Sequence, residues 1–250
     1  MHLLIPCAGM GRRMGSSRNK LLLTLLDKPL IAWTLLAAQA SVRISWIGVI
    51  VQPDDLVDFQ KIVTNLPLTK TIHFIQGGAT RQDSVYKGLQ SLPKTAEYVL
   101  IHDGARCLAT PDLFDRCAEA ILYCQGLVTA VPVKDTIKVV DSQTDLIINT
   151  PNRRQLWAAQ TPQGFKVKEL QQCHAEAHDQ GWEVTDDAAL FEKCQLPVQI
   201  LEGEETNLKV TTPVDLAIAE FILRQRLGER LSREHLKANS IAVPYNDDAC

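Results

Sequence analysis

The chain has 250 residues, 46% of them hydrophobic and 22% charged, which is the composition of one ordinary globular domain. Its formal net charge of -3 provides no general attraction to nucleic acid or to an anionic membrane, and no apolar run approaches the roughly 20 residues that cross a bilayer. We therefore expect no nucleic acid and no membrane as partners, and any anionic ligand must be bound by a local cluster of cations.

Short apolar runs rich in β-branched residues alternate with helix-like segments along most of the chain. Such alternation is typical of βαβ units, so we expect an α/β fold built around a mostly parallel sheet. In chain order, the expected elements are a strand at 3–5, a helix at 29–39, a strand at 44–51, a helix at 53–65, a strand at 71–75, a helix from 80, a strand at 98–101, a helix from 110, a strand at 127–133, helices at 167–180 and 186–194, a strand at 198–201 and a helix from 212.

Two segments depart from this alternation. From about 132 to 158, short extended pieces flank a polar turn, which predicts a β-arm inserted into the α/β pattern. Residues 232–250 are polar and aperiodic, and we expect a loosely ordered tail there. Residues 1–231, with the arm included, are expected to form a single domain.

A glycine-rich loop with four cations follows the first expected strand. An α/β sheet binds its ligands beyond the carboxyl ends of its strands, and Gly9 and Gly11 allow backbone N–H groups to approach phosphate oxygens. Met14 replaces the third glycine of a dinucleotide-binding fingerprint, and the loop is not a Walker A motif. A solvated basic loop is the alternative, but the position behind a strand favours triphosphate binding. The residues concerned are Pro6, Cys7, Ala8, Gly9 and Gly11, with the cations Arg12, Arg13, Arg18 and Lys20.

A second charged loop, from His102 to Arg106, follows the strand at 98–101. Asp103 stands at the end of that strand, where an aspartate can hold Mg²⁺ because magnesium takes most of its ligands from water and phosphate. The alternative is an ordinary Asp-Gly turn with Arg106 on the surface. Charged loops after two strands of one sheet favour a ligand site.

Three further features are weaker when taken alone. The glycine-rich loop at 77–84 opens a helix and suits a nucleobase or a phosphate. Lys209 lies in a segment expected to be a short strand, where the alternation of side chains also allows it to face solvent. His174 and His178 are four residues apart on an expected helix, but no third metal ligand follows, and we expect a surface helix.

Taken in order, these segments resemble the 2-C-methyl-D-erythritol 4-phosphate cytidylyltransferases of the non-mevalonate isoprenoid pathway. The resemblance extends to about residue 225 and rests on segments 6–14 with Lys20, 77–84, 102–106, 135–138, 161–163, 185–186 and 207–211. It implies a Rossmann-like three-layer nucleotidyltransferase fold with a protruding β-arm. It also implies that the arm reaches a partner subunit, so that the protein is a homodimer.

The resemblance implies roles for individual residues. Arg13, Lys20 and Lys209 are expected to act on the phosphates of CTP as the catalytic cations. The acceptor, methylerythritol phosphate, is expected to be bound by Asp103, Arg106, Thr136, Arg153 and Thr185, of which Thr136 and Arg153 lie on the arm and serve the neighbouring subunit. The expected nucleotide-binding set comprises Gly78, Arg81, Ser84, Asp103 and Gly104 together with Pro6, Cys7, Ala8, Gly9 and Gly11.

The expected cofactor is a divalent cation, Mg²⁺ or another, held mainly by the CTP phosphates with Asp103 as the candidate protein ligand. The seven cysteines include no C-x-x-C pair and predict reduced thiols. We therefore expect the cytoplasm as the compartment, or the plastid stroma if a transit peptide has been removed.

The acceptor carries a phosphate monoester whose second pKa is about 6, so at neutral pH it is a dianionic nucleophile that needs no general base. We expect in-line attack on the α-phosphorus of CTP, giving 4-diphosphocytidyl-2-C-methyl-D-erythritol and pyrophosphate. Two alternatives stay open: transfer to another polyol phosphate such as ribitol 5-phosphate, and a non-catalytic nucleotide-binding protein. The intact cations and Asp103 argue against the second.

Overall fold

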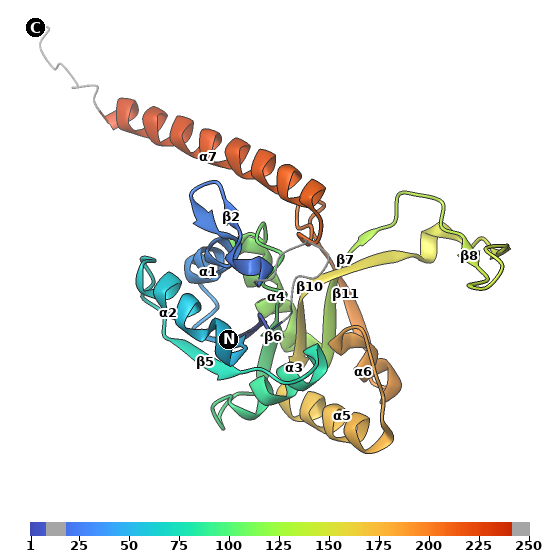
Figure 1. The fold of residues 1–250 in the computed structure, drawn as a ribbon. Helices are drawn as coiled ribbons and strands as arrows, with labels where there is room; N and C mark the ends of the chain where they lie inside the picture. Colours follow the sequence, from blue (N-terminus) through green and yellow to red (C-terminus); the bar gives the residue numbers. More distant parts are fainter. Residues whose placement is uncertain (9–18, 242–250) are drawn as a thin grey trace, which may run out of the picture.

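A seven-stranded sheet lies at the centre of the computed structural model, which describes residues 1–8 and 19–241 (Figure 1). The strand order is β11-β7-β10-β6-β1-β4-β5, and only the two pairings made by β10 are antiparallel. The expected α/β fold with a mostly parallel sheet is confirmed. The strands are β1 (His2–Pro6), β4 (Trp46–Val51), β5 (Ile72–Gln76), β6 (Tyr98–Ile101), β7 (Gly126–Pro132), β10 (Trp157–Lys166) and β11 (Val198–Glu202).

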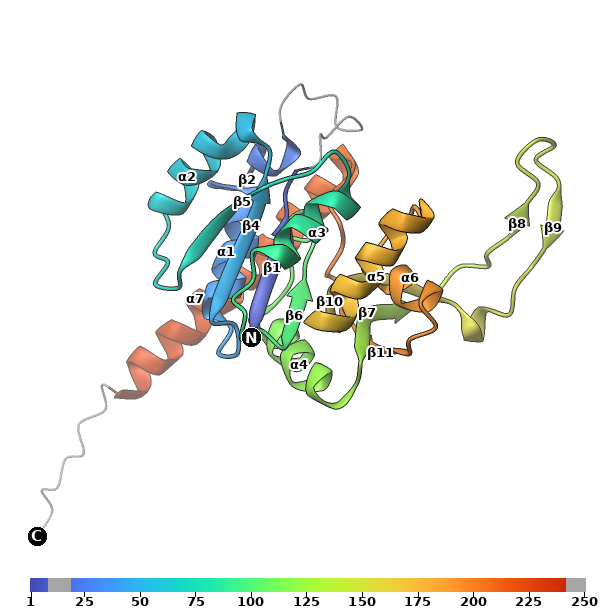
Figure 2. The same cartoon turned by 90° about the horizontal axis from the view of Figure 1, so that it is seen from below.

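Helices cover both faces of the sheet and give three layers (Figures 1 and 2). Successive side chains of β1 alternate between the faces, so Leu3 packs into the core beneath α1 and α4, while Leu4 packs into the core beneath α3, α5 and α6. The helices are α1 (Leu30–Ala40), α2 (Leu56–Thr64), α3 (Arg81–Gln90), α4 (Pro111–Ala120), α5 (Val167–Gln180), α6 (Asp187–Lys193) and α7 (Pro213–Ile241). Smaller elements are β2 (Thr24–Leu25), β3 (Lys28–Pro29) and the 3-10 turns at Lys20–Leu22, Pro53–Asp55, Ile121–Tyr123 and Arg153–Gln155.

The parallel arrangement brings several loops to one edge of the sheet. Strands β1, β4, β5 and β6 run parallel to one another, so the loops that follow them all leave at the carboxyl edge. Helix α3 packs closely on this part of the sheet because Gly88 has no side chain, and an added Cβ would lie 2.7 Å from Cδ1 of Ile50. This packing fixes where α3 begins, at Arg81, relative to the carboxyl edge.

The sequence did not predict strand β10, which lies between β6 and β7 and runs antiparallel to both. Its middle, residues 160–163, is polar and contains Pro162, so it neither alternates nor forms an apolar run. The register with β7 shifts between Ala159 and Gln163, where Pro162 has no N–H to donate to the ladder. Long-range pairing therefore overrides a weak local signal for strand formation.

The expected β-arm is present between Pro132 and Trp157, where the chain leaves β7 and returns as β10. The arm contains a short antiparallel pair, β8 (Val139–Val140) and β9 (Ile147–Asn149), and both views show it extending away from the body (Figures 1 and 2). A lone two-stranded ribbon has no core of its own. Apolar side chains of the arm are accordingly exposed, namely Ile137, Val139, Val140, Leu146, Ile147 and Ile148.

Helix α7 corrects the expected tail. It continues to Ile241, through residues 232–241 that were expected to be loosely ordered. This stretch contains neither glycine nor proline, and residues such as Glu, Lys, Leu and Ala favour a helix even without an apolar period. Residues 242–250 lie outside the part that the structure describes. No helix within the described residues is long and apolar enough to span a membrane.

Candidate active site

The loops after β1 and β5 meet at the carboxyl edge of the sheet. An added Cβ on Gly77 would lie 2.7 Å from Cβ of Ala8, so the two loops are in direct contact. The N–H group of Cys7 donates to the carbonyl of Ile50 at 2.7 Å, which continues the β1–β4 pairing by one residue. Pro6, Cys7 and Ala8 are therefore placed at the strand end, as expected, whereas Gly9, Gly11, Arg12, Arg13 and Arg18 lie outside the described residues.

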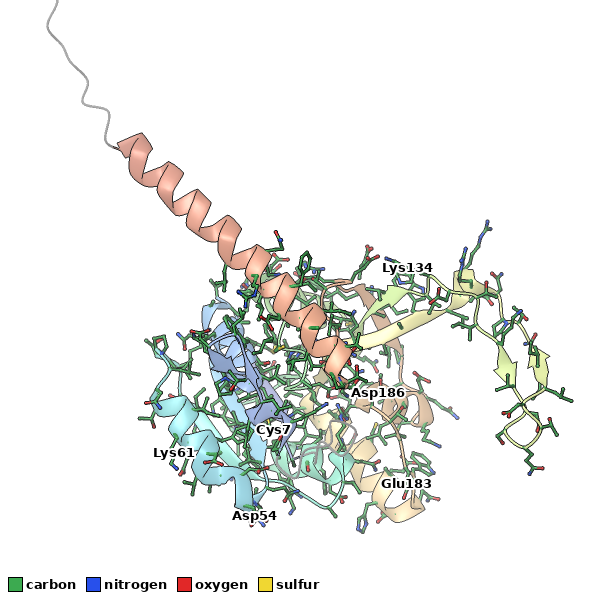
Figure 3. All side chains as sticks on the ribbon, turned by 45° about the horizontal axis from the view of Figure 1, so that its top comes forward. Cys7, Asp54, Lys61, Lys134, Glu183 and Asp186 are labelled. Carbon is green, nitrogen blue, oxygen red and sulfur yellow. The ribbon has the colours of Figure 1, made fainter. Side chains whose placement is uncertain are left out.

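The Cys7 side chain is not a reactive thiol. Burial raises its pKa well above the ordinary value, and the neighbouring carboxylates of Asp103 and Asp55 raise it further. The carbonyl of Cys7 accepts a hydrogen bond of 2.7 Å from the Asn19 side chain, which also donates to Asp55. These contacts make Cys7 part of the loop scaffold, and the figure of all side chains marks it within the body of the molecule (Figure 3).

The loop at 77–84 is shaped from within by Ser84. The Ser84 hydroxyl accepts a hydrogen bond from the N–H of Gly78 at 2.9 Å and donates to the carbonyl of Thr80 at 2.8 Å. The Thr80 and Asp83 side chains form a reciprocal cap on the first turn of α3. An added Cβ on Gly78 would lie 2.3 Å from Cβ of Asp83, so only glycine fits there. Ser84 is buried, and its position behind the loop supports the backbone of Gly78.

Asp103 lies between two cations. Its Oδ2 is 2.7 Å from Nζ of Lys209, and its Oδ1 is 3.5 Å from Nε of Arg81. Burial by itself would raise the pKa of this carboxyl, but Arg81 and Lys209 outweigh burial and hold the pKa well below its usual range. Asp103 is therefore an ionised carboxylate at neutral pH. The Asp103 N–H donates to the hydroxyl of Thr161 on β10, which fixes the backbone at this point.

Residues 207–211 form a strap along the loop that contains Asp103, and not the short strand expected from the sequence. The Val210 N–H donates to the carbonyl of Ala105 at 2.9 Å, and the Val210 carbonyl accepts from Nζ of Lys20 at the same distance. The strap thus holds Lys20 and Lys209 beside one another at the Asp103 loop. Val210 itself is buried against the side chains of α7 and its neighbours, which anchors the strap.

Arg106 is turned toward the same strap. Its Nη1 donates to the carbonyl of Asn207 at 2.8 Å, and its Nη2 donates to the carbonyl of Ala159 on β10 at 3.2 Å. Gly104 packs closely, since an added Cβ would lie 3.0 Å from Cδ1 of Leu21. Arg106, Gly104 and Asp103 therefore belong to one cluster with Lys20, Lys209 and Arg81.

Thr136 and Arg153 are not part of that cluster within one chain. Both lie on the arm and are exposed, and Nη1 of Arg153 donates to the carbonyl of Lys134 at 2.6 Å. Lys134 marks the base of the arm in Figure 3, and the ribbon beyond it runs away from the body. Thr185 is exposed immediately before Asp186, which accepts a hydrogen bond from Ala189 and so caps the N-terminus of α6.

Sequence reasoning missed two buried residues near the cluster, Asp187 and His174. Asp187, the first residue of α6, pairs with Arg81 at 2.8 Å, and His174 lies 3.3 Å from the other oxygen of Asp187. The expectation that His174 faces solvent is wrong, whereas His178 is exposed. His174 shares a helix face with the buried residues Leu170 and Ala177, and this spacing was the signal available in the sequence.

The donor set at this edge bears on the expected divalent cation. Within residues 1–8 and 19–241 no three His, Cys, Asp or Glu side chains are grouped so as to hold a metal ion. Asp103 is ionised and nearly buried, and Lys209 and Arg81 already contact its two oxygens. This set fits a cation such as Mg²⁺ that takes most of its ligands from nucleotide phosphates and water.

The chain matches the family model described as 2-C-methyl-D-erythritol 4-phosphate cytidylyltransferase over residues 1–225. A protein of that name from Crocosphaera subtropica is 71% identical over 226 residues, which cover 90% of this chain and 99% of the relative. Its counterpart from Nostoc sp. is 70% identical over 226 residues, with the same coverage of each chain.

Solved structures agree with these sequence matches. The crystal structure of 4-diphosphocytidyl-2C-methyl-D-erythritol synthase from Anaerococcus prevotii is similar with a TM-score of 0.79 and 29% identity, covering 89% of this chain and 97% of that one. The crystal structure of 2-C-methyl-D-erythritol 4-phosphate cytidylyltransferase from Thermus thermophilus is similar with a TM-score of 0.72 and 32% identity, covering 89% of this chain and 98% of that one.

Proposed function

This chain belongs to the family of 2-C-methyl-D-erythritol 4-phosphate cytidylyltransferases, and on that premise we propose how its residues share the work of the reaction. The enzyme converts CTP and 2-C-methyl-D-erythritol 4-phosphate to 4-diphosphocytidyl-2-C-methyl-D-erythritol and pyrophosphate. In the proposed step, an oxygen of the acceptor phosphate forms a bond to the α-phosphorus as the bond to the departing pyrophosphate breaks. The acceptor is already ionised, so no side chain has to remove a proton.

Charge stabilisation is assigned to Lys20, Lys209 and Arg13. The observation that carries this assignment is the strap, because it holds Lys20 through the Val210 carbonyl and Lys209 against Asp103 at the same loop. Two ammonium groups fixed beside the phosphate-binding edge can neutralise charge that grows as pyrophosphate leaves, without reorganising during the reaction. Arg13 joins them through the resemblance of the loop that follows β1.

The nucleotide is assigned to the two glycine-rich loops. Backbone N–H groups after β1, from Pro6, Cys7, Ala8, Gly9 and Gly11, would bind its phosphates. Gly78, shaped by Ser84, and Arg81 at the start of α3 would bind the cytidine portion. Gly104 keeps the neighbouring Asp103 loop close to both, because its missing side chain leaves room for Leu21.

The acceptor is assigned to residues of two subunits. Asp103, Arg106 and Thr185 would come from one chain, and Thr136 and Arg153 from the arm of a partner in a homodimer. Support comes from the arm itself, which extends away from its own body and exposes Leu146, Ile147 and Ile148 at more than 60% each (Figures 1 and 2). A surface of that kind is covered when a second subunit binds it.

We assign Asp103 as the protein ligand of a divalent cation that otherwise binds the phosphates. Its low pKa keeps it charged across the physiological range. When bound, the cation would neutralise phosphate charge and help orient the triphosphate. The cytoplasm is the proposed compartment, and free buried thiols such as Cys107 and Cys117 are compatible with its reducing conditions.

The experiment that tests this proposal is pyrophosphate release with Mg²⁺, measured for the four nucleoside triphosphates against methylerythritol phosphate and ribitol 5-phosphate. We expect turnover with CTP and methylerythritol phosphate only. Turnover with ribitol 5-phosphate at a similar kcat/KM would change the acceptor, and no turnover with any pair would contradict catalysis. Repeating the active pair with EDTA, and then with added Mn²⁺, tests the requirement for a divalent cation.

A further inference from the structure

The Asp187 carboxylate is completely enclosed by protein, although it carries charge. It opens helix α6, its side chain is 1% exposed, and its Oδ2 lies 2.8 Å from Nη1 of Arg81. A buried carboxylate is costly unless a cation and hydrogen bonds compensate it. Arg81 supplies that compensation from the first turn of α3.

Arg81 is held between two carboxylates. Nη1 contacts Asp187 at 2.8 Å, whereas Nε is 3.5 Å from Asp103. The side chain remains 29% exposed, and a guanidinium has five N–H donors, so donors remain for a ligand. Because the guanidinium is planar, fixing it at two points also fixes the direction of the remaining donors.

The short contact to Asp187 has a consequence for Asp103. If Asp187 lost its charge, Arg81 would shift toward the only other carboxylate that it contacts among the described residues. That shift would compete with Lys209, which contacts Asp103 at 2.7 Å. Asp187 therefore keeps Arg81 at a distance at which Asp103 remains available.

His174 backs the Asp187 carboxylate from helix α5. Its Nε2 is 3.3 Å from Oδ1 of Asp187, and its side chain is 1% exposed. The imidazole stacks on Tyr86 of α3, with ring centroids 5.6 Å apart and an interplanar angle of 14°. Helices α3, α5 and α6 thus all contribute to the position of one carboxylate, and Asp187 has little freedom to follow Arg81 if Arg81 moves.

We propose that Asp187, backed by His174, is a positioning residue that sets the orientation of Arg81 toward the nucleotide. The inference rests on the proposed assignment of Arg81 to the nucleotide site. Asp187 does not touch the reacting atoms in this scheme. It acts through Arg81, and its loss should affect nucleotide binding more than the chemical step.

The test is Asp187→Asn, which keeps the shape of the side chain and removes its charge. We expect the KM for CTP to rise about tenfold with kcat changed less than about threefold, which is the pattern of a lost ground-state contact. The matched control is Asp115→Asn, a partly buried carboxylate that binds the loop after α1 at the opposite edge of the sheet. It should lower the melting temperature without changing the KM for CTP.

A double-mutant cycle with Arg81→Gln separates positioning from a general loss of stability. If Asp187 acts through Arg81, adding Asp187→Asn to Arg81→Gln should raise the KM for CTP no further. An unchanged KM in folded Asp187→Asn, or equal effects in both backgrounds, would overturn the proposal. If Asp187→Asn does not fold, His174→Gln carries the test, and an unchanged KM for CTP in that variant would likewise overturn it.

The same cycle distinguishes the two levels of the argument. If Arg81→Gln itself leaves the KM for CTP unchanged, the assignment of Arg81 to the nucleotide site is wrong, and the positioning role is lost with it. If Arg81→Gln raises the KM and Asp187→Asn does not, the assignment of Arg81 stands and only the positioning role fails.

Discussion

The ammonium group of Lys209 lies 2.7 Å from Oδ2 of Asp103, in a contact between a strap near the C-terminal helix and the loop that follows a central strand. Lys209 helps to keep Asp103 ionised in spite of its burial. It also presents a cation at the edge where the triphosphate is proposed to bind. The pair therefore has two roles that a single substitution can separate.

We predict that Lys209→Met lowers kcat about 100-fold, the size of effect seen when one group that stabilises developing charge is removed. The pKa of Asp103 should rise toward its ordinary value, because a cation that lowers it is gone. The acidic limb of the kcat/KM profile should accordingly move to higher pH. Kinetics between pH 5 and 8 check this, with Lys61→Met on the exposed face of α2 as the control. An unshifted acidic limb would contradict the role of Lys209 toward Asp103.

Lys20→Ala should lower kcat far more than it weakens CTP binding. The reason is that charge on the departing phosphates grows in the transition state, so the ammonium contributes more there than in the ground state. The measurements are single-turnover kinetics and a CTP dissociation constant from calorimetry. A variant that lost CTP affinity and kept its kcat would show that Lys20 only binds the nucleotide.

Mixing two inactive variants tests the arm. Lys209→Ala damages the body of a subunit, and Arg153→Ala damages its arm. If the arm serves the partner, each mixed dimer contains one site with neither change, and random mixing should restore about a quarter of wild-type activity. Co-expression with two affinity tags isolates the mixed dimers. Activity no higher than the sum of the separate variants would mean that the arm does not complete the partner's site.

Stability should fall in acid because of His102. Burial lowers the pKa of His102 to about 4, from an ordinary value of 6.5. Between these two values the unfolded chain binds a proton that the folded chain does not, so the free energy of unfolding decreases as the pH falls through this window. The contribution is about 3 kcal/mol once the pH approaches 4. Urea unfolding at pH 7 and pH 4.5 should show a smaller decrease for His102→Gln than for the wild type, and an equal decrease would count against this cause.

Ending the chain after Leu231 should leave kcat/KM within about twofold of the full-length value, because surface changes away from buried features have small effects. The contacts that anchor α7 are kept, since Ala219 and Leu223 are buried and Arg226 donates to the carbonyl of Leu108. The relatives that match over 226 residues are 99% covered by that match. Activity and thermal unfolding of residues 1–231 check this, and a large loss of activity would assign a function to the end of the helix.

The sequence by itself predicted the features that depend on neighbouring residues. Apolar runs located β1, β4, β5, β6 and β7, and the glycine-rich and charged loops after them indicated the carboxyl edge as the ligand site. Parallel strands leave their loops at one edge whatever the details of packing, so the co-location of Ala8, Gly77 and Asp103 followed from the pattern. Strand β10 and the helical stretch at 232–241 escaped this reasoning because their local signals are weak.

Only the tertiary structure decided which charges meet. Lys209 faces Asp103 because the strap hydrogen-bonds to Ala105, and no local pattern in residues 207–211 contains that information. In the same way, the partners of Asp187 come from α3 and α5, so neither its burial nor its charge could be interpreted from α6 alone. A sequence specifies the period of each element, whereas ion pairs between elements depend on the distances that packing sets.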